Sequence, residues 1–232
     1  MIPLLTCPLP DVKNLSIHRR LCYVLQGILF LELLAALWQG NWLPAFTAAG
    51  IISITFIPYF VERRFRVHIP PQMQLMGIAF VFASLFLGEM RGYYTRFWWW
   101  DIALHTTSGL LLGIAGFLLV HVLNEIEKIG MHLKPGFVAF FAFLFAVGLG
   151  ALWEIFEFSM DTFFGTTMQK PMLHDPSGLL DTMVDLIVDT LGALVISLFG
   201  YYHLKVVGST SFLEKWIETF INKNPHLFSR RN

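Results

Sequence analysis

The chain has 232 residues and a formal net charge of zero; 56% of its residues are hydrophobic and only 14% are charged. Its mean hydropathy of +0.62 is too high for a soluble domain and is typical of a polytopic membrane protein. The neutral charge balance argues against nucleic acid as a partner, and two cysteines, Cys7 and Cys22, argue against a disulfide framework. Membrane lipids are therefore the first predicted partner.

In chain order, a polar segment, 1–20, is followed by six apolar segments of about the length that a membrane-spanning helix needs. Polar, basic or aromatic residues of the kind found at membrane interfaces separate them. Pro44 falls in the first turn of the second segment, where a helix tolerates proline. The predicted spans are Leu21–Trp38, Leu43–Val61, Met73–Gly88, Trp98–Val122, Gly136–Phe158 and Leu179–Tyr202.

After the last span, the residues from Ser211 to Glu214 fit a capping box that opens a short helix. Its apolar residues form one stripe, which predicts a helix lying in the membrane interface. We therefore predict an all-α fold, a polytopic transmembrane bundle of about six spans with a C-terminal interfacial amphipathic helix. The expected organisation is a cytoplasmic segment 1–20, a six-helix transmembrane domain 21–202 and a cytoplasmic tail 203–232.

The basic residues predict how the chain is oriented. With six spans, thirteen of the sixteen lysines and arginines fall on the side of the two termini. The other three are Arg91, Arg96 and Lys170. Because lysine and arginine collect on the cytoplasmic side of membrane proteins, both termini are predicted to be cytoplasmic.

Acidic side chains in the last three spans share helix faces and a common depth. An ionised carboxylate at the centre of a membrane helix costs roughly 2.5–3.5 kcal/mol, so these groups should face protein, water or a cation. The order of the spans brings them towards the extracytoplasmic side, with Asp189 deepest. The polar residues concerned are Asp101, His105 and Ser108 in the fourth span, Glu154, Glu157 and Asp161 in the fifth, and Asp181, Asp185 and Asp189 in the sixth.

So many like charges repel one another unless they share protons or bind a cation. Many carboxylates with one histidine favour a hard divalent ion, Mg²⁺, Mn²⁺ or Ca²⁺, over zinc. For Asp101, Asp161 and Asp181 an ordinary role at a helix end stays open as an alternative. The predicted metal ligands are Asp101, His105, Glu154, Glu157, Asp161, Asp181 and Asp185.

Two further sets of residues are predicted from the same pattern. In the loops on the acidic side, the few cations either hold a phosphate or neutralise the carboxylates, and both alternatives stay open. The predicted catalytic residues are His105, Glu154, Glu157 and Asp185, with His105 moving a proton. The predicted substrate-binding residues are Arg91, Arg96, Ser108 and Gln169.

The combined pattern resembles that of the YjdF-type inner-membrane proteins of bacteria, across essentially all six spans. More loosely it resembles VanZ-like membrane proteins, from which the extra acids between Trp153 and Asp161 depart. The resemblance implies a bacterial inner-membrane location and a polar site, but no established reaction. It rests on Asp101-x-x-x-His105, Trp153-Glu154-x-x-Glu157-Phe158-x-x-x-Asp161, Gln169 and Asp181-x-x-x-Asp185-x-x-x-Asp189-x-x-Gly192.

Three functions compete at this point. The first is metal-assisted chemistry on a lipid-linked or phosphate-bearing substrate at the extracytoplasmic leaflet. The second is ion-coupled transport through the acids, against which the sequence has no detectable inverted repeat. The third is a non-catalytic membrane factor that binds a cation or a lipid headgroup. The sequence does not choose between enzyme and non-enzyme, nor does it give the oligomeric state.

Overall fold

The computed structural model describes residues 17–125, 133–170, 175–202, 205, 219–220 and 222–225, which form helices and no strand. Six of the helical segments are long and apolar enough to cross a membrane, which confirms the predicted all-α fold with six spans. The predicted amphipathic helix begins at Ser211 and falls mostly outside the described residues. The chain divides into two compact units, residues 1–90 and 91–232.

The first unit contains three spans built from five helical segments. Leu29, Ile51 and Phe86 form its buried apolar core. Within it, the Gln26 side-chain amide donates a hydrogen bond to the Thr55 hydroxyl at 3.2 Å and joins the first two spans. The segments are α1 (Ile17–Trp38), α2 (Trp42–Thr55), α3 (Ile57–Phe65), α4 (Pro71–Val81) and the π-helix η2 (Phe82–Met90).

The span predicted as one helix from Leu43 to Val61 is interrupted at Phe56 in the structure. Pro58 has no N–H to donate to a carbonyl in the preceding turn, so α2 ends and α3 begins with proline in its first turn. Sequence analysis also missed the change of α4 into a π-helix at Phe82. Neither difference removes a span.

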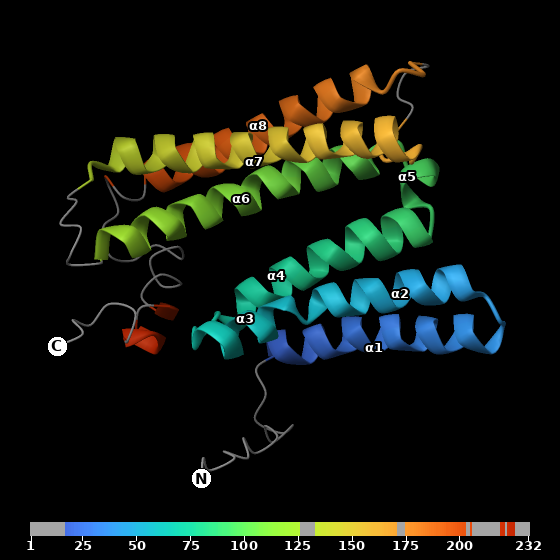
Figure 1. Cartoon of the computed structure of the whole chain (residues 1–232). Helices are drawn as coiled ribbons and strands as arrows, with labels where there is room; N and C mark the ends of the chain where they lie inside the picture. The colour runs from blue at the N-terminus through green and yellow to red at the C-terminus, as the bar shows by residue number, and fades with distance from the viewer. Residues whose placement is uncertain are drawn as a thin grey trace, which may run out of the picture. The chain divides into compact units, whose positions relative to one another are not determined.

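The second unit contains a short helix and three long helices that pack against one another (Figure 1). The helix α7 continues six residues beyond Phe158, where the predicted span ended, and it stops where Gly165 adopts a left-handed conformation with φ of 64°. At the start of α8, the Asp175 carboxylate accepts a hydrogen bond from the Leu180 amide at 3.0 Å. The helices are α5 (Tyr93–Arg96), α6 (Trp100–Glu125), α7 (Pro135–Phe164) and α8 (Leu179–Tyr202).

Glycines let the three long helices of this unit approach closely. A Cβ atom added at Gly109 of α6 would lie 2.2 Å from the Asp189 carbonyl oxygen of α8. One added at Gly192 of α8 would lie 2.4 Å from the Thr106 carbonyl oxygen of α6. Without a hydrophobic driving force between helices in lipid, such close backbone contact is a main source of helix association.

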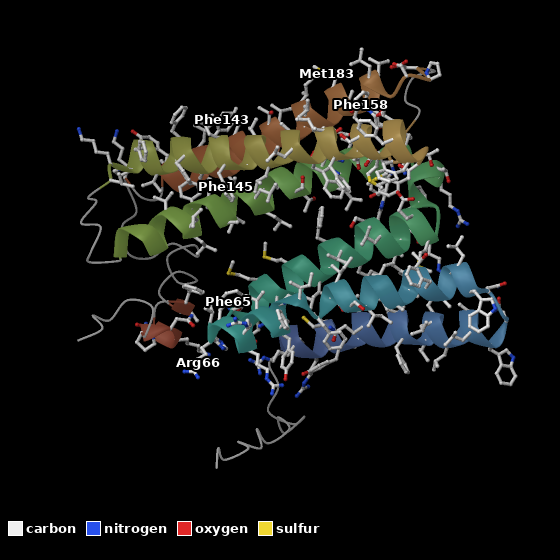
Figure 2. The ribbon with its side chains drawn as sticks, viewed as in Figure 1. Phe65, Arg66, Phe143, Phe145, Phe158 and Met183 are labelled. Atoms are coloured by element: carbon white, nitrogen blue, oxygen red, sulfur yellow. The ribbon has the colours of Figure 1, made fainter. Side chains whose placement is uncertain are left out.

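Large apolar side chains cover the outward faces of the helices in both units (Figure 2). Phe65 of α3, Phe158 of α7 and Met183 of α8 are 61%, 56% and 45% exposed. Apolar surface on this scale marks a membrane-facing protein rather than a water-soluble one. The buried residues of α7 and α8, in contrast, include five carboxylates: Glu154, Glu157, Asp181, Asp185 and Asp189.

Candidate functional site

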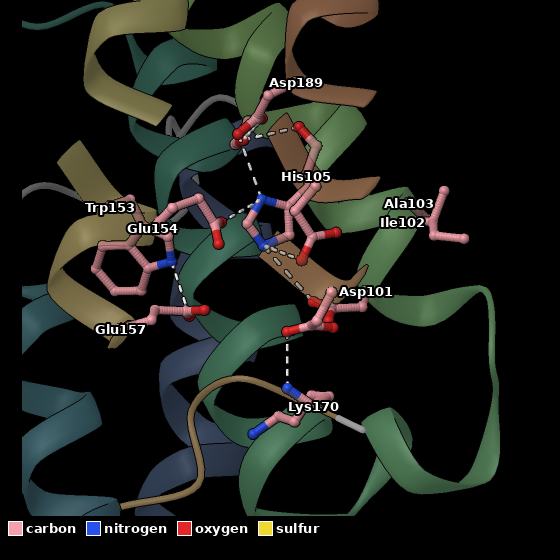
Figure 3. Close-up of polar contacts among 12 residues, drawn as sticks. Asp101, Ile102, Ala103, His105, Trp153, Glu154, Glu157, Lys170 and Asp189 are labelled. Carbon is pink, nitrogen blue, oxygen red and sulfur yellow. Dashed lines mark hydrogen bonds and ion pairs between the residues drawn. The ribbon is translucent and has the colours of Figure 1, made fainter. Parts of the chain in front are cut away.

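His105 of α6 lies at the centre of a group of four carboxylates contributed by three helices (Figure 3). Its Nε2 atom is 3.7 Å from Asp101 Oδ1 and 3.7 Å from Asp185 Oδ2. Its Nδ1 atom is 3.3 Å from Asp189 Oδ2 and 3.7 Å from Glu154 Oε1. One imidazole therefore has two carboxylates beside each ring nitrogen.

Most of these carboxylates are shielded from solvent. Glu154 and Asp185 are 2% and 0% exposed, and none of their four side-chain oxygens has a hydrogen-bond partner among the described residues. Asp181 is also buried and keeps one oxygen without such a partner. Burying a polar group without a hydrogen bond is costly, and burying an unpaired charge costs more. These oxygens are therefore suited to a cation or to shared protons.

Three residues of the group have the spacing of ligands to one metal ion. Asp101, His105 and Asp185 each offer one ligand atom, and these atoms lie within 4.8 Å of one another. Oxygen ligands bind Mg²⁺ at about 2.1 Å and Ca²⁺ at up to about 2.6 Å, so two ligands of one ion lie at most about 5 Å apart. The three residues therefore form a candidate metal-binding group.

Glu157 and Asp181 lie around this group and have partners of their own. The Trp153 indole N–H donates a hydrogen bond to Glu157 Oε1 at 2.9 Å. The backbone amide of Lys170, in the segment between α7 and α8, donates to Asp181 Oδ2 at 2.7 Å. These contacts fix both carboxylates beside the group; their roles as metal ligands and, for Glu157, in catalysis stay predictions.

Asp161 has a different environment from the other predicted ligands. Its Oδ1 atom accepts hydrogen bonds from the Thr166 hydroxyl at 2.6 Å and the Met168 amide at 2.7 Å. Its Oδ2 atom accepts one from the Gln169 amide at 2.8 Å. The carboxylate thus organises the chain that follows α7, and Asp161 is not part of the group of three around His105.

Replacing Asp161 with alanine should release the segment 166–169, because three donors lose their acceptor at once. We expect faster hydrogen–deuterium exchange at the Met168 and Gln169 amides, by about tenfold or more for a loss of about 1.4 kcal/mol or more in local stability. Ser159→Ala is the control, since the Ser159 hydroxyl donates a hydrogen bond within its own helix, to the Ile155 carbonyl. Unchanged exchange at both amides would contradict this role of Asp161.

The predicted substrate-binding residues divide into two kinds. The Ser108 hydroxyl lies within hydrogen-bonding distance of the His105 carbonyl and of Asp189 Oδ1, so it lies inside the group. The Gln169 amide donates to the Thr182 hydroxyl at 2.9 Å and to the Gly178 carbonyl at 3.4 Å, which ties the segment after α7 to the start of α8. Arg91 and Arg96 are exposed around α5. Their binding of a substrate stays a prediction.

Asp189 belongs to the group; sequence analysis placed it among the converging acids, but not among the predicted metal ligands, catalytic residues or substrate-binding residues. Its signal was present in the sequence, as the third acid at four-residue spacing on α8. The structure adds that it is 3% exposed and that a Cβ atom at Gly150 of α7 would lie 2.7 Å from its Oδ2. Asp189 is therefore enclosed between all three long helices.

Comparison with known proteins assigns the chain to a family whose match covers the whole of this site. The family described as "Predicted membrane protein (DUF2238)" matches residues 18–206, which include all the carboxylates named above. The chain belongs to this family. This membership is consistent with the predicted YjdF-type resemblance, while the VanZ-like resemblance stays a prediction.

A relative of this DUF2238 protein is described as an uncharacterized protein of Thermotoga maritima. The two are 31% identical over 146 residues, which cover 63% of this chain and 70% of the relative. No solved structure matches the chain. The comparisons thus give the class of protein, a membrane protein.

Proposed function

We propose that this DUF2238 protein binds a divalent cation through Asp101, His105 and Asp185 and uses it on a phosphate-bearing, lipid-linked substrate. The observation that carries the proposal is the 4.8 Å spacing of these three ligand atoms. A second, independent observation supports it. The carboxylate oxygens of Glu154 and Asp185 are buried and have no hydrogen-bond partner among the described residues. A bound cation would compensate the negative charge of these two groups.

The ligand types favour a hard ion. Two carboxylates and one imidazole, with further carboxylates alongside, suit Mg²⁺, Mn²⁺ or Ca²⁺. Zinc sites more often take several histidines or cysteines, and the group around His105 has a single histidine and no cysteine among the described residues. We therefore expect Mn²⁺ to bind and to serve as a spectroscopic substitute for Mg²⁺.

The chain offers groups for the remaining chemistry. A bound cation would supply a Lewis acid to a phosphoryl oxygen. Glu154 lies 3.7 Å from His105 and has no hydrogen-bond partner among the described residues, so it is free to accept a proton. The segment between α7 and α8 also carries a cation, Lys170, whose backbone amide bonds Asp181 and whose ammonium group donates to the Thr167 carbonyl at 2.9 Å. Such a cation suits a phosphate-bearing substrate.

The proposed location is the bacterial inner membrane, with both termini in the cytoplasm and the carboxylate group towards the extracytoplasmic side. The distribution of basic residues supports this orientation. Reporter fusions after Lys134 and after Arg231 should report the cytoplasm, and fusions within 159–178 should report the opposite side. A C-terminus on the extracytoplasmic side would reverse the proposed orientation.

The proposal is tested with protein purified in detergent and stripped of metal by a chelator. We expect one Mn²⁺ per chain to bind, measured by the loss of the free Mn²⁺ signal in electron paramagnetic resonance. The Mn²⁺-loaded protein should then release inorganic phosphate from phosphatidic acid or from a polyprenyl diphosphate, each presented in mixed micelles. Adding the chelator should stop the release. Binding without phosphate release from either substrate would favour a non-catalytic cation-binding factor.

A second function has one observation in its favour. Four carboxylates lie 3.3–3.7 Å from the ring nitrogens of His105, an arrangement that also suits the passage of protons. Proteoliposomes separate the two functions, since an ion-coupled transporter would move protons across the membrane when a gradient is imposed. Proton movement without Mn²⁺ binding would replace the metal proposal by this one.

A further inference from the structure

We propose that Asp189 is a positioning residue that holds the His105 ring with its proton on Nδ1 and turns Nε2 towards Asp101 and Asp185. The inference rests on the proposed function, because it concerns how the histidine is prepared for a cation. It assigns a role to one of the two buried carboxylates of the group, Asp189 and Glu154, that are not among the three candidate ligands.

The two ring nitrogens of His105 have different environments. Nδ1 is within hydrogen-bonding distance of Asp189 Oδ2, at 3.3 Å. Nε2 is 3.7 Å from an oxygen of Asp101 and 3.7 Å from an oxygen of Asp185, too far for hydrogen bonds but suited to ligands around a common ion. The ring thus presents one nitrogen to a supporting acid and the other to the candidate ligands.

Glu154 is the competing partner for Nδ1, and the geometry favours Asp189. The distance from Nδ1 to Glu154 Oε1 is 3.7 Å, beyond the range of a hydrogen bond. In addition, neither oxygen of Glu154 has a hydrogen-bond partner among the described residues, whereas the two oxygens of Asp189 lie within hydrogen-bonding distance of His105 Nδ1 and of the Ser108 hydroxyl, both on α6. Asp189 is therefore the carboxylate that the surrounding chain holds in place for His105.

Asp189 itself has little freedom to move. The Ser108 hydroxyl lies within hydrogen-bonding distance of both Asp189 Oδ1 and the His105 carbonyl, and its single proton is shared between them, so the serine links the acid to the helix that carries the histidine. On the other side, Gly150 leaves only enough room for the carboxylate, since a Cβ atom there would lie 2.7 Å from Oδ2. Two helices thus fix the acid contributed by the third.

A carboxylate in this position has a known physical effect. A histidine that binds a metal through one nitrogen commonly donates its other N–H to an acceptor, which fixes the tautomer and makes the ligand nitrogen more basic. Loss of such an outer partner typically weakens metal binding by about 10–100-fold. Asp189→Asn should therefore bind Mn²⁺ about 10–100-fold more weakly than the wild type.

The binding test compares three variants of the full-length protein in detergent, with Mn²⁺ as the probe. Asp189→Asn should show the loss of Mn²⁺ affinity of about 10–100-fold. Ser108→Ala should lose only a few-fold in affinity, and Asp175→Asn should bind Mn²⁺ as tightly as the wild type. Asp175 is the matched control because its carboxylate caps α8 outside the group. Wild-type affinity in a folded Asp189→Asn variant would overturn the inference and leave the proposed function standing.

A second measurement needs no variant of Asp189 and separates positioning from a merely structural role. The wild-type protein is labelled with ¹⁵N-histidine and saturated with Mg²⁺, and the His105 signals are assigned by their absence in His105→Gln. We expect the proton on Nδ1. A proton on Nε2 would overturn the inference, whereas a wild-type protein that binds neither ion would overturn the proposed function and this inference with it.

Discussion

Asp185→Asn should weaken Mn²⁺ binding by more than about 100-fold, which exceeds the loss typical of an outer partner because the substitution removes a ligand charge. Asp185 is fully buried, and its Oδ2 lies 3.7 Å from His105 Nε2 in the candidate metal-binding group. Asparagine keeps the size of the side chain, so a loss of binding reports the charge rather than a cavity. Titration of the free Mn²⁺ signal measures the affinity.

The thermal stability of the metal-free protein, unlike its Mn²⁺ affinity, should not fall in Asp185→Asn. In metal-free protein, Asp185 contributes a buried carboxylate whose two oxygens have no hydrogen-bond partner among the described residues. Replacing it with a neutral amide removes a like charge from beside Asp101, Asp181 and Glu154. We therefore expect metal-free Asp185→Asn to unfold at a temperature no lower than metal-free wild type.

Asp161→Asn is the control for the binding measurement. It also removes one carboxylate from the second unit, but from a residue whose oxygens accept hydrogen bonds from the segment after α7. Its Mn²⁺ affinity should stay within a few-fold of the wild type. Wild-type affinity in Asp185→Asn, or an equal loss in Asp161→Asn, would show that the ion does not bind at the proposed ligands.

The sequence predicts the number of spans and the faces that carry acids, for reasons that are local. Length and hydropathy are enough to find a helix that crosses a membrane. A spacing of three or four residues is enough to place Glu154 with Glu157, or Asp185 with Asp189, on one side of a helix. These regularities hold within one helix, whatever the helix packs against.

What the sequence does not predict depends on contacts between segments. Asp161 and Glu157 share a helix face, yet only the fold of residues 166–169 brings three donors to Asp161. In the same way, the importance of Asp189 follows from its distances to His105 on another helix and to Ser108. The interruption at Phe56 has a local cause, Pro58, and was predictable from it.

Gly109→Ala should destabilise the second unit by about 3 kcal/mol, at the upper end of the range for overpacking a close contact. The added Cβ atom would lie 2.2 Å from the Asp189 carbonyl oxygen and 3.1 Å from the Ala193 amide nitrogen. Both are backbone atoms of α8 and cannot rotate away, so α6 and α8 must separate. The separation also draws Asp189 away from His105 and Ser108, so Mn²⁺ binding should weaken in the same variant.

Gly148→Ala is the matched control, because Gly148 is an exposed residue of α7 with nothing within 4 Å of an added Cβ atom. Alanine is the better helix former by about 1 kcal/mol, so this variant should be neutral or slightly stabilised. Unfolding is followed by circular dichroism in detergent, with Mn²⁺ affinity measured on the same preparations. If Gly109→Ala were as stable as Gly148→Ala and bound Mn²⁺ equally well, α6 and α8 would not meet at Gly109. The close approach of α6 and α8 would then not be what holds Asp189 beside His105.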